Sequence, residues 1–111
     1  MNYTQDQVNN IVFEARAEAN RAARNALAQY GDRDACGFAW VNIYKVKGNT
    51  KLGKMLAAAG VRKNSYERAF QIWNPANLGT QSVGILEIGA QAAANVFRKY
   101  GFEAYAGSRL D

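Results

Sequence analysis

CGFAWVNIY, residues 36–44, is the stretch that decides the fold of this chain of 111 residues. Aromatic and β-branched residues dominate it, and such a composition predicts a β-strand. Successive side chains of a strand point to opposite faces. One face would carry Cys36, Phe38, Trp40, Asn42 and Tyr44, and the other Gly37, Ala39, Val41 and Ile43. Both faces are largely apolar, so we expect this strand to lie at the centre of a sheet.

The segment before this strand, residues 4–30, predicts one long helix. Thr4 can serve as its N-cap, with Gln7 at the capping-box position, and Gly31 is a natural stop. Apolar residues recur on one face with the helical period: Val8, Ile11, Val12, Ala15, Ala19, Ala22, Ala23 and Ala26. A helix of about 40 Å exceeds what a small domain needs. Part of its alanine seam is therefore expected to pack on another subunit.

The segments after the strand continue the alternation of helices and strands. The pattern predicts a helix at 51–59 capped by Thr50, a strand at 65–73, a loop at 74–81, a helix from 82 to 100 and a strand at 102–109. The core stripe of the last helix would be Leu86, Ala90, Ala93, Ala94 and Phe97. The order α-β-α-β-α-β predicts an α/β fold, a two-layer sandwich with a three-stranded sheet. The short first crossover helix leaves an α+β fold with antiparallel strands open.

The whole chain, residues 1–111, is expected to form one domain, with the helix at 4–30 and an α/β core at 35–111. No apolar run approaches the roughly 20 residues of a membrane span, and the N-terminus lacks the pattern of a signal peptide. A cytosolic protein without a membrane partner is therefore expected.

The composition excludes several kinds of catalytic and metal-binding site. The chain has no histidine, which removes the commonest general base and metal ligand and every triad that needs one. The one cysteine, Cys36, excludes an internal disulfide and a cysteine zinc cage, and we expect it to be a small buried residue. We therefore expect a protein that is not an enzyme, with no catalytic residues, no metal and no cofactor.

The charge of the chain is concentrated in one segment. The net charge is +5, and residues 45–68 carry seven basic residues against one acid, a balance of +6. Such a field attracts phosphates, nucleic acid or acidic surfaces. Within it, residues 48–54 spell G-x-x-x-x-G-K, most of a phosphate-binding loop, but Met55 stands where Ser or Thr should hold Mg²⁺. We interpret this segment as a basic capped turn, with a plausible anion site beside Lys51 and Lys54.

A second group of residues is aromatic. Phe38, Trp40, Trp73 and Tyr105 are expected on one face of the sheet, with Gln71 and Arg109 nearby. Such a face can stack nucleobases, or a helix or second subunit can cover it, which we favour. The predicted ligand-binding residues combine both groups: Trp40, Lys45, Lys47, Lys51, Lys54, Arg68, Trp73 and Arg109.

Three segments carry a resemblance to a known type of protein: ACGFAWVNIY (35–44), SYERAFQIWNP (65–75) and TQSVGILEIGAQAAANVFRKYGFEAYAGSRLD (80–111). Together they resemble a family of small proteins encoded by tailed bacteriophages. The resemblance implies a setting rather than an activity. In that setting the protein would work in the host cytoplasm, either against host defence or on phage nucleic acid.

These observations lead to one functional expectation with alternatives. We expect a non-enzymatic phage accessory protein that binds a small phosphorylated ligand, such as a nucleotide signal of host defence, as a homo-oligomer and most simply a dimer. A nucleic-acid-binding protein using the same basic segment is the first alternative. A protein inhibitor of a host factor and a virion component are the others.

Overall fold

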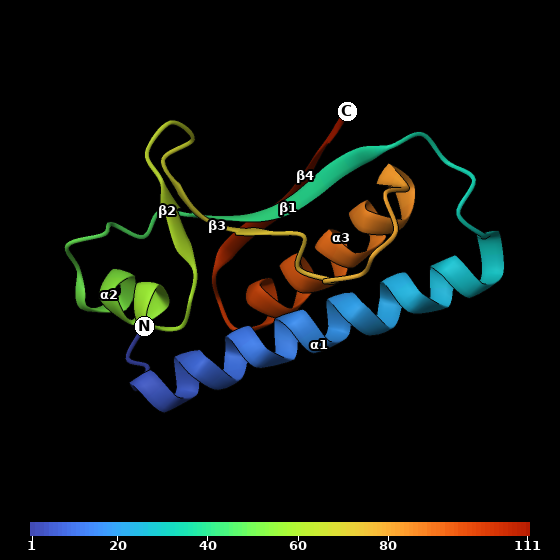
Figure 1. Cartoon of the computed structure of the whole chain (residues 1–111). Coiled ribbons are helices and arrows are strands. Elements are labelled where there is room, and N and C mark those ends of the chain that lie inside the picture. Colours follow the sequence, from blue (N-terminus) through green and yellow to red (C-terminus); the bar gives the residue numbers. More distant parts are fainter.

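The computed structural model describes residues 1–111 and contains three helices and one four-stranded sheet (Figure 1). The elements in chain order are α1 (Gln5–Tyr30), β1 (Gly37–Tyr44), α2 (Lys51–Ala58), β2 (Arg62–Asn64), β3 (Ala69–Trp73), α3 (Val83–Lys99) and β4 (Glu103–Leu110). The order is therefore α-β-α-β-β-α-β, and the fold is mixed α+β. The predicted order and the three-stranded sheet were wrong by one strand.

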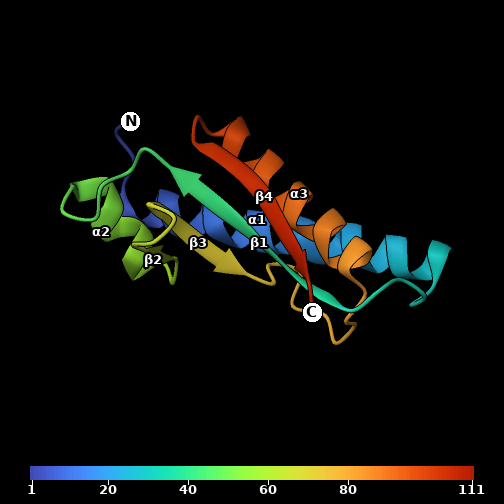
Figure 2. The same ribbon diagram turned by 90° about the horizontal axis from the view of Figure 1, so that it is seen from above.

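The sheet has the order β2-β3-β1-β4, and every neighbouring pair is antiparallel. β1 lies in the interior of the sheet, as predicted, while β2 and β4 are the edges (Figure 2). From β1 onward the connectivity is β-α-β-β-α-β with the first strand between the third and the fourth, which is the split β-α-β arrangement. α1 is an addition before this unit. This arrangement supports many unrelated functions, so the topology assigns none.

The extra strand arises because the predicted strand at 65–73 contains a hairpin turn. The side chain of Asn64 accepts a hydrogen bond from the backbone N–H of Glu67 at 3.1 Å, and this closes the turn. Arg68 completes it with a φ of 55°, in the left-handed region that few residues other than glycine adopt. Asn and Ser favour turns because their side chains bond to nearby backbone. Asn64-Ser65 was thus the overlooked signal.

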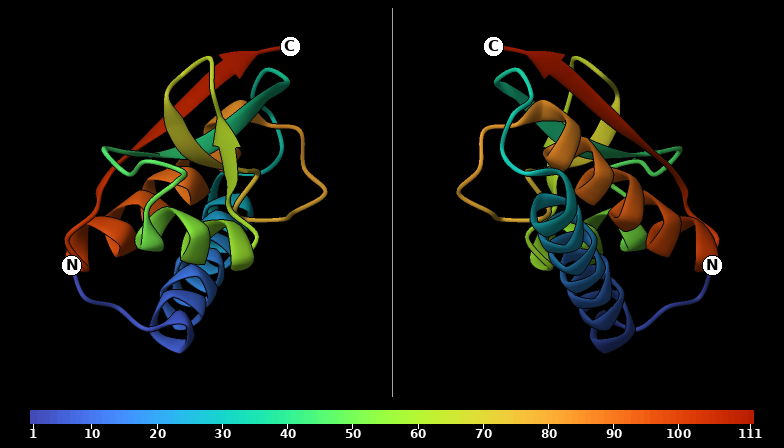
Figure 3. Two further views of the ribbon diagram at one scale, coloured as in Figure 1. Left: turned by 90° about the vertical axis from the view of Figure 1, so that its left-hand side faces the viewer. Right: turned by 90° about the vertical axis from the view of Figure 1, so that its right-hand side faces the viewer.

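The long first helix begins and ends as predicted. Thr4 and Gln7 form both bonds of the capping box, and Gly31 follows with a φ of 77°. Its alanine seam is buried within the chain and not reserved for another subunit as expected. Figure 3 shows α1 beside α3, the helix against which it packs. Gly89 of α3 permits this close approach, because a Cβ there would lie 3.1 Å from the carbonyl oxygen of Ala19 and 3.3 Å from the Cβ of Ala23.

The core lies between the helices and one face of the sheet. The predicted stripe of α3 is buried in full, and Phe70, Ile43 and Val41 of the sheet meet the helix layer with 1% exposure or less. Figure 1 shows α1 and α3 on the same side of the sheet. The opposite face of the sheet carries no helix, so the molecule has one covered face and one open face.

Two smaller findings concern the sequence expectations. Cys36 is exposed rather than buried, because it precedes β1 at the end of the connection from α1. None of the helices combines the length and the apolar content needed to cross a membrane.

Candidate functional site

The open face of the sheet gathers the aromatic residues that the alternation of side chains predicted. Trp40 of β1 lies opposite Trp73 of β3 on one side and Gly107 of β4 on the other. Phe38 lies opposite Arg109. Directly opposed residues of neighbouring strands point to the same face. Three strands therefore contribute to one surface.

The rings on this face contact one another. The centroids of Trp40 and Trp73 lie 5.0 Å apart, and those of Phe38 and Trp73 lie 5.9 Å apart. Trp40 is seated over Gly107, since a Cβ at Gly107 would lie 2.5 Å from the indole nitrogen. Trp73 keeps 48% of its surface exposed and Tyr105 52%. Large apolar rings that remain this exposed on a sheet mark a surface that can take a flat apolar ligand.

Two arginines lie against these rings. The guanidinium carbon of Arg109 is 5.5 Å from the ring centroid of Phe38 and 5.9 Å from that of Trp73. The guanidinium of Arg98, in the last turn of α3, lies 5.6 Å from the ring of Tyr105. A guanidinium can stack on an aromatic face and still donate hydrogen bonds from its edge to an anion. The surface thus offers apolar rings and positive charge side by side.

A buried amide network lies beside the rings on the same face of the sheet. Gln71 donates from Nε2 to Oδ1 of Asn42 at 2.8 Å and accepts from the indole N–H of Trp73 at 2.5 Å. Asn42 in turn donates to the carboxylate of Glu67 at 2.5 Å. Asn42 and Gln71 are each only 5% exposed. The network fixes the Trp73 indole, so the ring is held in place before any ligand arrives.

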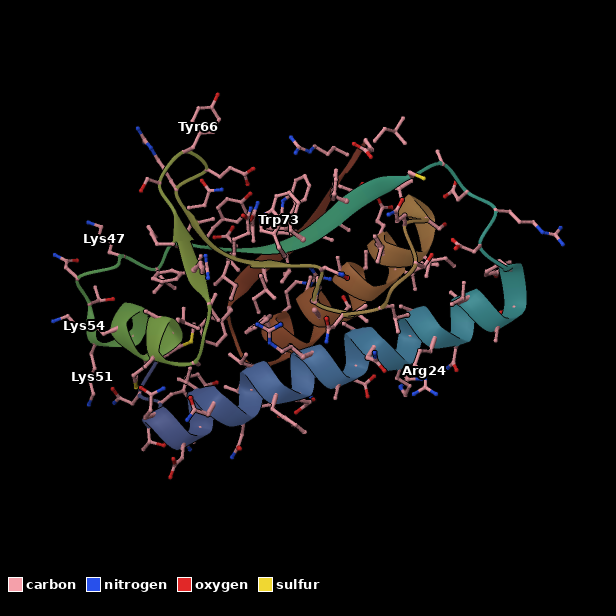
Figure 4. All side chains as sticks on the ribbon, viewed as in Figure 1. Arg24, Lys47, Lys51, Lys54, Tyr66 and Trp73 are labelled. Carbon is pink, nitrogen blue, oxygen red and sulfur yellow. The ribbon has the colours of Figure 1, made fainter.

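The predicted ligand-binding residues fall into two groups. Trp40, Trp73 and Arg109 lie together on the open face. Lys47, Lys51 and Lys54 lie around α2 at one end of the molecule and point outward, away from Trp73 (Figure 4).

The two remaining basic residues of that prediction lie apart from both groups. Lys45 follows β1 and pairs with Glu103 at 3.3 Å. Arg68 lies in the β2–β3 turn. The structure therefore does not join the lysine cluster and the aromatic surface in a single cavity.

The G-x-x-x-x-G-K segment forms the capped turn that we expected. The Thr50 hydroxyl accepts from the N–H of Gly53 at 3.1 Å and donates to the carbonyl of Lys47 at 2.6 Å. Gly53 is buried against that same carbonyl, and a Cβ there would collide with it. Met55 is buried. The glycine is thus required by packing. The N–H of Gly53, which a bound phosphate would need as a donor, is already bonded to the Thr50 hydroxyl.

The cavities of the molecule are small and carry few charges. Two cavities border Trp73. One of about 250 Å³, lined also by Phe38 and the loop after β3, has no Lys or Arg, and one of about 300 Å³ is lined also by Arg16 and Arg62. None of the five main cavities has more than two basic side chains. No cluster of three or more metal-ligating side chains is present. We therefore take the exposed rings and arginines on the open face of the sheet, rather than a cavity, as the candidate site.

Sequence reasoning missed Arg98 as part of this surface. The residue was assigned only to the end of a helix, and its neighbours gave no hint of a ligand. A signal existed, because a long side chain in the last turn before Gly101 can reach back over the strand that follows.

Comparison of the chain with models of protein families, with curated proteins and with solved structures finds no match.

Proposed function

We propose that the protein binds single-stranded nucleic acid on the open face of its sheet. The observation that carries the proposal is the exposed surface of Phe38, Trp73 and Tyr105 with Arg109 stacked against it. Bases of a single strand stack on exposed rings of this kind, at about 1–3 kcal/mol per base. A base edge or phosphate can meanwhile accept hydrogen bonds from Arg109.

The spacing of the positive groups favours a strand over a single nucleotide. Arg109 lies at one end of β4 and Lys45 beside Glu103 at the other, with Arg98 between them over Tyr105. Beyond Lys45 the chain continues into the lysines of α2. Basic side chains therefore follow the length of β4, where Lys45 is paired with Glu103, and others lie around α2 at the end of the molecule. An extended ligand could follow this track, whereas a small phosphorylated ligand would meet only part of it.

The setting follows the phage resemblance. We propose that the protein acts in the host cytoplasm as a phage accessory protein and binds its ligand without catalysing a reaction. Binding of a small phosphorylated signal molecule, our expectation from the sequence, becomes an alternative outcome of the same experiment.

Binding can be tested with labelled single-stranded DNA and RNA of about 4–16 nucleotides, the range of comparable sites, and with mononucleotides. Fluorescence anisotropy would report affinity, and quenching of tryptophan emission would report stacking, because both tryptophans of the chain lie on this face. Trp73→Ala should weaken binding about 5- to 150-fold, the equivalent of one stacked base. Phe13→Ala is the matched control, since Phe13 is a 75% exposed ring on α1.

The salt dependence separates the alternatives. For single strands, log K falls with log salt by about 0.7 per phosphate contacted, so contact with Arg98, Arg109 and the lysines predicts a slope near −2 or steeper. Binding of a mononucleotide as tight as that of an oligomer, with a shallow slope, would favour the small ligand. If no nucleic acid quenches the tryptophans, or if Trp73→Ala and Phe13→Ala bind equally well, the proposal is overturned.

A further inference from the structure

The two edges of the sheet differ in how well they are protected. β2 is an edge strand of three residues that carries Arg62 and Lys63. Short, charged edges are the usual protection against pairing with another chain. β4 is an edge strand of eight residues, and Figure 2 shows no strand beyond it. An edge of this length invites a partner strand.

The hydrogen bonds of β4 identify the groups that are free at this edge. The N–H of Asp111 donates to the carbonyl of Cys36. In this antiparallel register the backbone N–H and C=O groups of the odd-numbered residues of β4 therefore point toward β1. The backbone groups of Ala104, Ala106, Ser108 and Leu110 consequently face outward. Among them, the carbonyl of Ala104 accepts a bond from the side chain of Arg98.

The sequence of β4 is self-complementary about its midpoint. It reads Glu103-Ala-Tyr-Ala-Gly-Ser-Arg109, centred on Ala106. Two copies paired antiparallel about Ala106 would place Glu103 opposite Arg109, Ala104 opposite Ser108 and Tyr105 opposite Gly107. Opposite charges are favourable cross-strand pairs, and an aromatic ring beside an edge glycine helps to fix the register. Each pair would occur twice.

We propose that the outer edge of β4 pairs with β4 of a second copy of this chain, antiparallel about Ala106, to form a symmetric dimer. Ala106 is one of the outward-facing residues, so its N–H and carbonyl bond to those of Ala106 in the second copy. The side chain of Arg98 releases the Ala104 carbonyl, which then accepts a hydrogen bond from the backbone N–H of Ser108 in the second copy. A two-fold interface of this kind is self-complementary by symmetry.

The dimer would join the two sheets into one of eight strands, twice the four of a single chain, with a continuous open face. Tyr105 of each copy would then lie over Gly107 of the other, beside the Trp40 that is seated there. The proposal depends on the edge alone and stands whether or not the open face binds nucleic acid.

The first test measures molecular mass by light scattering over a concentration series. The expected mass at high concentration is twice the 12.2 kDa of the chain. Ala106→Pro should give a monomer, because proline removes an outward N–H that no group of the same chain uses. Circular dichroism verifies that the variant is folded.

Charge exchange tests the register without proline. Glu103→Arg and Arg109→Glu should each weaken self-association about tenfold or more, since each places like charges opposite each other twice. An equal mixture of the two variants should recover a dimer, because each Arg then meets a Glu. Lys63→Glu, on the β2 edge, is the control and should leave the mass unchanged.

Three results would overturn the proposal. They are a wild-type monomer at every concentration, a folded Ala106→Pro variant that remains a dimer, and a mixture of charge variants that associates no better than either alone. Nucleic-acid binding is read separately by tryptophan quenching, so failure of the dimer and failure of the proposed function give different results.

Discussion

The two faces of the sheet are built from the same strands but differ in what covers them. On the covered face, Val41, Ile43 and Phe70 are closed off from water by α1 and α3. On the open face no helix covers the rings: Trp40 lies over Gly107, and the indole of Trp73 is bonded to Gln71. The comparison shows that apolar character alone does not decide which face a domain covers. What distinguishes the open face is its pair of buried amides, Asn42 and Gln71, which bond to each other and to Glu67 and Trp73.

The largest expected effect contrasts two phenylalanines. Phe70→Ala should lower the free energy of unfolding by about 3–5 kcal/mol, the cost of emptying a filled site in a core. Phe38→Ala should cost about 1 kcal/mol, the value of an exposed aromatic pair. Urea denaturation of both variants measures the difference. Equal losses would mean that the open face is a second core rather than a binding surface.

The second prediction tests how closely the helix layer is packed. Gly89→Leu should destabilise the fold by about 1–3 kcal/mol, because the side chain would push α3 away from α1. A Cβ at this position already lies 2.8 Å from that of Ala76. Gln91→Leu, on the exposed side of the same helix, is the control and should change stability little. Similar unfolding midpoints for both variants would contradict the close contact between the helices.

The third prediction concerns the two buried amides on the open face. Asn42→Ala removes a bond to Gln71 and one to Glu67, and leaving buried polar partners unsatisfied costs about 1–3 kcal/mol. Tryptophan emission should also shift to longer wavelength, since Gln71 would no longer hold Trp73 in place. Asn25→Ala, on the exposed surface of α1, serves as the control. An unchanged emission spectrum would show that the network does not position the ring.

The smallest effect is expected at the surface of the helix layer, where Glu14 of α1 accepts bonds from Lys99 and from the Tyr100 hydroxyl. The hydrogen bond from Lys99, followed by that from Tyr100, lowers the pKa of Glu14 below its ordinary value of 4.5. A lowered carboxyl pKa stabilises the fold above the unfolded-state pKa, and this contribution is lost as pH falls through the folded-state pKa.

Glu14→Gln should therefore lower Tm slightly at about pH 7, and thermal melts should show this difference shrinking as pH falls below the ordinary carboxyl pKa of 4.5. The pair is solvent-exposed, so the difference at neutral pH should be small. Glu18→Gln, whose partner Arg21 lies on the same helix, provides the comparison. A larger loss at the acidic pH than at the neutral one would contradict the sign of the pKa change.

Much of the fold followed from local patterns. The capping box at Thr4, the stop at Gly31 and the core stripe of α3 are local signals, and all three are confirmed. The strand pairing and the hairpin within 65–73 were not predicted, because pairing depends on contacts between distant segments. The turn at Asn64 was outweighed by the aromatic and β-branched residues around it.

The candidate site was only half predicted, for a related reason. The alternation along β1 and β3 placed Trp40 and Trp73 on one face correctly, and Arg109 with them. The lysines of the segment 45–68 were grouped with these rings because they are close in sequence to β1. α2 carries them instead to one end of the molecule (Figure 4). Charge along a sequence does not reveal which surface a helix will present.

The seat that Gly107 provides for Trp40 has a consequence for optical spectroscopy. It helps to hold the two indoles of the chain with their centroids 5.0 Å apart and their planes inclined by 32°. Chromophores this close couple their electronic transitions, so the native protein should show a paired band of opposite signs in circular dichroism. Neither helix α1 nor helix α2 contributes an indole to that band. The amplitude of this band would therefore report whether β1, β3 and β4 are folded, independently of the helical signal.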